Sequence, residues 1–381
     1  MKIGILTYHH VINDGAVLQA YAVAQCLQGE FPNARVEVIN YRPRIIEIRD
    51  VRFVLKKNMI SVVENVRRYF RFKRFIANNL PLSKDRLITD DYSRALRFLE
   101  SNNYDLIVVG SDEVWKIEKG RYARPFPSIY WMGEGVTCRK VAFAASANRT
   151  IYDELSVEQK KMMKRLLDSF DLLSVRDNHT IDFLKSLGID DGKKIYKIPD
   201  PTFILDHFPD NTMELLKKKW VDFKKPLLCV MLCDPKTSER VCLHFKEKGY
   251  VVIGLSFYVP RADVNLCGML NPFEWAEAIK HFDFCITDRF HGAIYCLKNM
   301  VPFVCLEKTA GYKDCKSKIL SLLKDFDMTN QYLPYYNNFN LDELENKVNG
   351  SKALFYNSDI DTKLRAQKEL IISFAAKIKA D

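Results

Sequence analysis

Short β-rich runs recur along this chain of 381 residues, and stretches long enough to form helices separate many of them. In the first half the runs are Lys2–Thr7, Val36–Asn40, Leu106–Val109, Lys140–Ala144, Leu172–Val175 and Ile195–Ile198. The second half adds Leu227–Leu232, Val251–Leu255, Phe284–Thr287 and Phe303–Leu306. Strands that alternate with helices form parallel sheets with right-handed crossovers. The pattern therefore predicts an α/β protein.

A polar, lysine-rich stretch at Glu214–Lys225 separates the two series of runs. The chain is also longer than one hydrophobic core usually allows. We predict two Rossmann-like domains, at residues 1–206 and 207–360, that face each other across a cleft. Doubly wound sheets bind ligands at the carboxyl ends of their strands, so the cleft is the expected site. Residues 361–381 repeat apolar side chains at three- and four-residue spacing, which predicts a helix that docks on a neighbouring core.

The composition favours a globular protein of the cytoplasm. Apolar residues make up 48% and charged residues 28% of the chain, an ordinary balance for a folded domain. The ten cysteines are scattered without zinc-binding spacing, so free thiols in a reducing compartment are favoured and no metal is expected. The N-terminal apolar run is too short for a signal peptide, and no run reaches the roughly 20 residues of a membrane span.

A basic segment at residues 51–75 carries most of the net charge of +10. It contains eight lysines and arginines but only one acid, Glu64, and aromatic and aliphatic residues are interleaved with the basic ones. Such a helix can bind peripherally to the inner face of an anionic membrane. Alternatively, it can pack on its own domain and expose its basic face to solvent. No recognition motif accompanies the charge, so a nucleic-acid partner is not expected.

An anion site is predicted where the run Phe284–Thr287 breaks abruptly into Asp-Arg-Phe-His-Gly and a helix-like segment follows. This order predicts a strand, a tight turn ending near Gly292, and a helix N-terminus. Backbone N–H groups there favour anions, and Arg289 adds a permanent cation. His291 can exchange a proton near neutral pH. Together they indicate chemistry on a phosphorylated or carboxylated substrate.

The turn after the first strand is a second candidate. Asn13 or Asp14 can cap the helix that follows, and Gly15 permits close approach of a ligand. Capping alone would explain these residues. In the functional interpretation, Asn13 and Gln19 provide hydrogen-bonding groups at the cleft.

Two further strands end in charged side chains. Ser111 and Asp112 follow Leu106–Val109, and a carboxylate at a strand's carboxyl end suits acid/base work as well as it suits a helix cap. Arg176 follows Leu172–Val175, where it can bind an anion or form a surface ion pair. Both interpretations remain open for each residue.

Taken together, these motifs resemble those of the polysaccharide pyruvyl transferase family. The matching pieces are MKIGILTYHH, NDGAVLQAYAVAQCL, VEVINYRP, YDLIVVGSDEVW, KVAFAAS, LLSVRD, IPDPTFIL and ITDRFHGAIYCLKNMVPFV. The resemblance implies two Rossmann-like domains in a GT-B-like arrangement. It also implies transfer of pyruvate from phosphoenolpyruvate to a sugar of a cell-surface polysaccharide or its precursor, as a ketal with release of phosphate and without a cofactor.

The resemblance also implies roles for individual residues. Donor-binding positions fall on Arg176, Arg289 and His291, with Gly292 beside them, and cleft-lining positions fall on Asn13, Gly15, Gln19, Ser111 and Asp112. The chain departs from the family pattern at Asp14, Glu113, Lys116 and Ala147-Asn148, which lie on the presumed acceptor side. The acceptor, a sugar or a lipid-linked glycan, is therefore left open.

These residues suggest a division of labour. Donor binding is expected to charge His291 and make it the general acid or a clamp on the leaving phosphate, and Asp112 is the candidate base. Two other functions fit the same features: a GT-B nucleotide-sugar glycosyltransferase, and a non-catalytic relative that binds a sugar or an anion.

Overall fold

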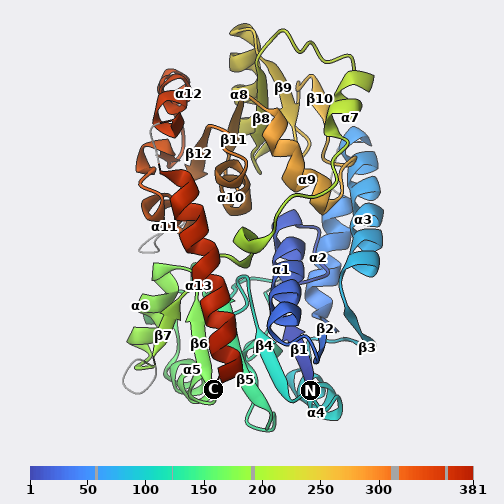
Figure 1. Cartoon of the computed structure of the whole chain (residues 1–381), viewed down its shortest axis with the longest axis vertical. Coiled ribbons are helices and arrows are strands. Elements are labelled where there is room, and N and C mark those ends of the chain that lie inside the picture. Colours follow the sequence, from blue (N-terminus) through green and yellow to red (C-terminus); the bar gives the residue numbers. More distant parts are fainter. Residues whose placement is uncertain (56–58, 122, 190–193, 310–316, 357–358, 381) are drawn as a thin grey trace.

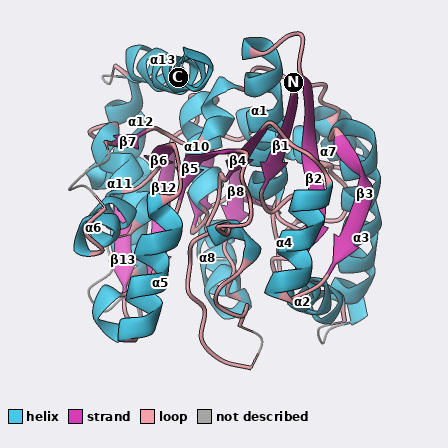
Figure 2. Cartoon of the chain, turned by 90° about the horizontal axis from the view of Figure 1, so that it is seen from below, coloured by secondary structure: helices cyan, strands magenta, loops and turns pink. Residues whose placement is uncertain are grey.

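The computed structural model describes residues 1–381 except 56–58, 122, 190–193, 310–316, 357–358 and 381. Lys56 and Lys57 of the basic segment therefore lie outside the described residues. Two parallel sheets are stacked along the long axis of the molecule, each flanked by helices (Figures 1 and 2). The predicted α/β fold with two Rossmann-like domains is confirmed.

The first sheet has seven parallel strands in the order β3-β2-β1-β4-β5-β6-β7. Its strands are β1 Lys2–Leu6, β2 Arg35–Arg42, β3 Leu82–Ile88, β4 Leu106–Val109, β5 Arg139–Ala145, β6 Leu172–Val175 and β7 Ile195–Lys197. Its helices are α1 Asp14–Glu30, α2 Arg44–Val54, α3 Met59–Asn79, α4 Tyr92–Ser101, α5 Val157–Asp168 and α6 Asn178–Ser186. The strand order reverses between β1 and β4, which is where doubly wound sheets bind ligands.

The second sheet repeats this topology with six strands, in the order β10-β9-β8-β11-β12-β13. Its strands are β8 Leu227–Met231, β9 Val251–Gly254, β10 Val264–Asn265, β11 Phe284–Thr287, β12 Phe303–Lys308 and β13 Tyr332–Tyr335. Its helices are α7 Thr212–Lys218, α8 Pro235–Glu247, α9 Pro272–Ala278, α10 Phe290–Lys298, α11 Lys318–Asp325 and α12 Leu341–Tyr356. The second reversal lies between β8 and β11.

The last helix, α13 (Ile360–Ala380), leaves the second domain and runs back along the first (Figure 1). Its Phe374 ring contacts the rings of Phe143 and Tyr196 at centroid distances of 5.5 and 5.6 Å. The backbone carbonyl of Ile378 accepts a hydrogen bond from the Arg139 guanidinium. The predicted docking of a C-terminal helix on a neighbouring core is thus confirmed, and the core belongs to the first domain.

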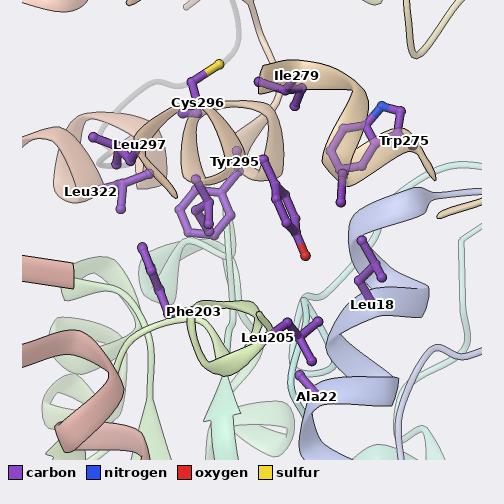
Figure 3. Close-up of a cluster of buried hydrophobic side chains, with 14 of the residues drawn as sticks. Leu18, Ala22, Phe203, Leu205, Trp275, Ile279, Tyr295, Cys296, Leu297 and Leu322 are labelled. Atoms are coloured by element: carbon purple, nitrogen blue, oxygen red, sulfur yellow. The ribbon is translucent and has the colours of Figure 1, made fainter. Parts of the chain in front are cut away.

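One continuous hydrophobic core joins the two domains. Leu18 and Ala22 of α1 and Phe203 of the linker (a 3-10 turn, Pro201–Ile204) face Trp275 of α9 and Tyr295 of α10 (Figure 3). Because these side chains come from both domains, their burial fixes the domains against each other and shapes the cleft between them.

Helix α3 also contacts both domains. Its contacts show whether the basic segment packs on the protein itself. Arg68 is buried, and its guanidinium pairs with the Asp14 carboxylate at 2.5 Å and donates to the Ser256 carbonyl of the second domain. Phe72 and Phe75 are buried on the same side of the helix. One face of the basic segment therefore packs on the protein itself. Among the described residues, no helix has both the length and the apolarity to cross a bilayer.

Candidate active site

The loops at both strand-order reversals converge on one cavity of about 390 Å³ between the domains. The loop after β1 contributes Asn13, the loop after β4 contributes Asp112, and the start of α10 contributes Arg289 and His291. Four of the predicted site residues therefore line a single space. This follows from topology, because the carboxyl ends of β1, β4 and β11 all point to the cleft.

The Asp200 carboxylate, which the sequence analysis did not single out, organises the floor of this site. It is fully buried, and it accepts hydrogen bonds from Gln19, from Arg176 at 3.0 Å, and from the hydroxyl and backbone N–H of Thr202 at 2.7 and 3.1 Å. Nε2 of His291 lies 3.4 Å away. Burial alone would raise the pKa of Asp200, but His291 and these donors outweigh burial and hold the pKa well below its usual range. Asp200 is therefore a fixed anion that orients His291.

His291 sits between Asp200 and the start of α1. Gly15 makes this arrangement possible, because a Cβ atom built on Gly15 would lie 2.0 Å from Nδ1 and 2.1 Å from Cγ of the imidazole. Only a residue without a side chain lets α1 approach the ring this closely. The predicted close approach at Gly15 is thus to a side chain of the protein.

Gly15→Ala is expected to lower catalytic activity at least tenfold, because the new methyl group must displace His291 from Asp200 or α1 from α10. Gly29→Ala, near the other end of the same helix, is the matched control, since nothing lies within 4 Å of its Cβ position. Alanine there is expected to preserve activity and to stabilise the helix by up to about 1 kcal/mol. Thermal unfolding and activity are measured on both variants. Equal activity of the two would contradict the assignment.

The cavity also contains a cation that no sequence motif indicated, Lys318. Lys318, the first residue of α11, reaches across the cleft to the Glu113 carboxylate at 2.6 Å, and Lys116 lies 3.4 Å from the same group. Burial opposes ionisation of Glu113, but the two ammonium groups hold its pKa well below the usual range. Lys318 could not be found from the sequence, because it follows no strand and acts through its partner in the other domain.

Two other acids of the cavity, Asp50 and Asp288, are shifted toward their neutral forms, which makes the field of the cavity more positive. Burial raises the pKa of Asp50 to about 7, although Lys73 opposes the shift. Burial likewise raises the pKa of Asp288, against the effect of Arg289. Arg289 and Lys318 add a guanidinium and an ammonium group, so the cavity favours an anionic ligand.

Arg289 begins α10 as its N-cap residue, and its side chain reaches along the cavity. Nη1 donates to Sγ of Cys233 at 3.1 Å, and the guanidinium lies 5.4 Å from the centroid of the Phe257 ring. Gly292 follows three residues later. Its backbone is closely packed, since a Cβ atom there would lie 2.4 Å from the Thr287 hydroxyl. Gly292 thus permits the sharp turn from β11 into α10.

Asp112 lines the cavity, and Arg176 lies behind it. Asp112 has a φ of 93°, a conformation that costs energy for a residue with a side chain and that recurs at functional sites. Its carboxylate lies 3.4 Å from Arg176, whose guanidinium also faces Asp200 and lies 5.2 Å from the centroid of the Phe290 ring. Arg176 is buried behind the cavity wall and joins the two carboxylates. Its predicted contact with the donor stays a prediction.

Two other predicted residues point away from the cavity. Gln19 is fully buried and donates to Asp200, so its amide serves the carboxylate. Ser111 is also fully buried, and its hydroxyl donates to the Ala144 carbonyl at 3.1 Å. Asn13 precedes α1 as its N-cap but makes no capping hydrogen bond with its side chain, which leaves the amide at the cavity.

Comparison with solved structures shows the same fold in distant proteins. UDP-GlcNAc 2-epimerase from Methanocaldococcus jannaschii is 12% identical, with a TM-score of 0.55 and coverage of 92% of each chain. A second UDP-N-acetylglucosamine 2-epimerase is 11% identical, with a TM-score of 0.52 and coverage of 97% of this chain and 92% of the other. Arabidopsis thaliana UGT89C1 complexed with UDP is 10% identical, with a TM-score of 0.50 and coverage of 99% and 100%. These similarities establish a GT-B-like fold.

The search of curated proteins produced no significant match. The sequence model of one family, described as polysaccharide pyruvyl transferase, matches residues 13–307. This range includes Asp200 and the residues that contact it, as well as Asn13, Asp112 and Arg289. The chain therefore belongs to the polysaccharide pyruvyl transferase family.

Proposed function

We propose that the protein transfers pyruvate from phosphoenolpyruvate to a sugar of a cell-surface polysaccharide or its precursor, forming a ketal and releasing phosphate. The observation that carries the proposal is the interdomain cavity. There, the guanidinium of Arg289 and the ammonium group of Lys318 lie in the same cavity as His291, which the buried Asp200 carboxylate orients. Family membership supplies the transferase class.

The donor is a small molecule with a phosphate and a carboxylate. Arg289 offers a planar fork of N–H donors that matches either group, and Lys318 offers a point charge. The N-terminus of α10 adds backbone N–H groups next to Arg289. Because Arg176 and Asp112 already pair with each other, we assign Arg176 the role of holding Asp112 and Asp200 in place.

The reaction needs one proton at the methylene carbon of the donor. Its delivery creates positive character at the neighbouring carbon, which an acceptor hydroxyl attacks. Loss of phosphate and attack by a second hydroxyl then close the cyclic ketal, so that one acceptor diol and one donor yield one ketal and one phosphate. His291, paired with Asp200, is the proton donor or the clamp on the leaving phosphate. Asp112 is the base that takes the proton of the attacking hydroxyl.

The acceptor side of the cavity extends over the loop after β4. Glu113 and Lys116, which depart from the family pattern, lie there with Asp50 and Glu118. Carboxylates and ammonium groups of this kind can accept and donate hydrogen bonds to sugar hydroxyls. We place the reaction in the cytoplasm, on a sugar that is free or linked to a lipid.

Incubation of the full chain with phosphoenolpyruvate and a panel of glycans tests the proposal. We expect phosphate release that depends on the acceptor, together with a mass gain of one pyruvate ketal on one glycan. A parallel incubation with UDP-sugars tests the alternative that the protein is a nucleotide-sugar glycosyltransferase. Sugar transfer from a UDP-sugar, or binding of glycans without any phosphate release, would overturn the proposal in favour of a glycosyltransferase or a non-catalytic relative.

A further inference from the structure

The outer faces of α2 and α3 form an exposed strip that combines apolar and basic side chains. On α3, Val63, Arg67, Phe70, Arg71 and Arg74 follow one another at intervals of one, three or four residues, which places them on one side of the helix. The exposed fraction is 50% for Val63 and 66% for Phe70. The opposite side carries Arg68, Phe72 and Phe75 and is buried. The strip is therefore additional to the packing face of the helix.

Helix α2 packs beside α3 and continues the strip. Ile48 and Val51 share one side of α2, and Leu55 directly follows the helix, with exposed fractions of 39%, 48% and 67%. Of the fifteen exposed large hydrophobic residues in the described part of the chain, five lie between Ile48 and Phe70. Such a concentration is unusual, because exposed apolar residues are normally scattered singly.

The charge of the strip is almost entirely positive. Arg67 pairs with Glu64, while neither Arg71 nor Arg74 lies within ion-pair distance of a carboxylate in the part of the chain that the structure describes. Both arginines are exposed. A helix surface that combines guanidinium groups with aromatic and aliphatic side chains matches a lipid interface, where the apolar groups enter the acyl boundary and the cations meet lipid phosphates.

A second basic and aromatic element lies at the end of α7 and in the loop that follows, which arches over the second domain in Figure 1. Trp220 is 93% exposed and Phe223 is 41% exposed. Exposed lysines surround them, at Lys217, Lys218, Lys219, Lys224 and Lys225. Tryptophan is the residue most typical of the membrane–water interface, where its ring is partly buried and its N–H stays hydrated.

From these observations we propose that α2 and α3 form a surface that binds an anionic phospholipid bilayer peripherally, and that the segment Lys217–Lys225 provides a second contact with the same bilayer. The charge excludes a neutral bilayer as the preferred partner, and the apolar side chains distinguish a bilayer from a soluble polyanion. Binding of a soluble polyanion would depend on the arginines alone, whereas binding of a bilayer depends on Phe70 and Val63 as well. The binding does not depend on the transfer reaction, so the two proposals can fail separately.

Co-sedimentation of the full chain with vesicles tests this surface. We expect binding to phosphatidylcholine vesicles that contain phosphatidylglycerol, weak binding to pure phosphatidylcholine, and release at high salt. The double variant Arg71→Gln/Arg74→Gln is expected to lower the partition coefficient about 30-fold, since each cation near an anionic surface contributes about fivefold. Val63→Ser/Phe70→Ser is expected to lower it about as much.

Matched controls are available on other surfaces. Arg94→Gln/Arg97→Gln removes two exposed arginines of α4, and Tyr336→Ser removes a ring that is 65% exposed, so both are expected to bind as the unaltered protein does. Because every altered side chain is exposed, unchanged thermal unfolding shows that the fold is retained. Equal sedimentation with both vesicle types, no sedimentation, or loss in the arginine variant alone would overturn the proposal.

Tryptophan fluorescence tests the α7 element separately. Trp115, Trp131 and Trp275 are buried, so Trp220 alone can change its environment at a surface. We expect a blue shift of the emission when anionic vesicles are added, and no shift in Trp220→Ser. An unchanged spectrum of the unaltered protein would contradict insertion of this segment.

Discussion

Replacing His291 by asparagine is expected to slow phosphate release from phosphoenolpyruvate by about 10²- to 10⁴-fold, the range in which a positioned acid or base contributes to a reaction. Asparagine is smaller than histidine and fits the space beside Gly15, so the fold is expected to be retained. What the variant loses is the ability to hold and release a proton. Steady-state phosphate release with phosphoenolpyruvate and an accepted glycan measures the effect.

His207→Asn is the matched control for His291. His207 has a side chain that is 88% exposed, and it also lies near a carboxylate, at 3.6 Å from Glu277. Its replacement is expected to leave the rate unchanged. If His291→Asn released phosphate as fast as His207→Asn, neither an acid nor a clamp could be assigned to His291.

Asp200→Asn is expected to have the largest effect on stability, lowering the free energy of unfolding by about 3–5 kcal/mol. Removing one partner of a buried ion pair costs this much. Here it leaves Arg176 with only its longer contact, at 3.4 Å, to the Asp112 carboxylate. Activity is expected to fall as well, because His291 loses the anion that orients it. Denaturant unfolding and phosphate release are measured on the same preparation.

Asp206→Asn is the control, since this carboxylate is 77% exposed and pairs only at the surface with Lys368. It is expected to change the free energy of unfolding by at most about 1 kcal/mol.

The pH dependence of the free energy of unfolding gives a second test of the role of Asp200. Because the folded pKa of Asp200 lies below its unfolded value, its contribution is present above about pH 4. The contribution is lost as the pH falls through the folded pKa, so the gap between unaltered protein and Asp200→Asn narrows only in strong acid. Equal stability of the two Asn variants at pH 7 would refute the role of Asp200.

Much of the fold could be predicted from the sequence, because strands buried on both faces appear as short apolar runs. β1, β4, β6 and β11 are of this kind. The strands that escaped prediction lie at or near sheet edges, where burial leaves little trace. β3 is mostly exposed, and β13 contains Pro334, which is tolerated only at such an edge.

The candidate site was predictable only where a residue directly follows a strand. Arg289 and Asp112 meet this condition, and both line the cavity. The role of Asp200 depends on hydrogen-bond donors on α1, after β6 and in its own turn, and on His291 of α10 at 3.4 Å. Only the folded chain brings these residues together. Lys318 depends in the same way on Glu113 across the cleft. Such roles are properties of the assembled domains, and no local pattern encodes them.

Titration of phosphoenolpyruvate into the protein, followed by calorimetry, tests the central claim that the cavity beside α10 holds the donor. We expect binding to the unaltered chain and at least tenfold weaker binding to Arg289→Gln, since a hydrogen bond to a charged group contributes about 1.5–3 kcal/mol. Arg261→Gln is the control, because its side chain is 71% exposed. Equal affinity of the two variants, or binding of UDP-GlcNAc in place of phosphoenolpyruvate, would contradict the account.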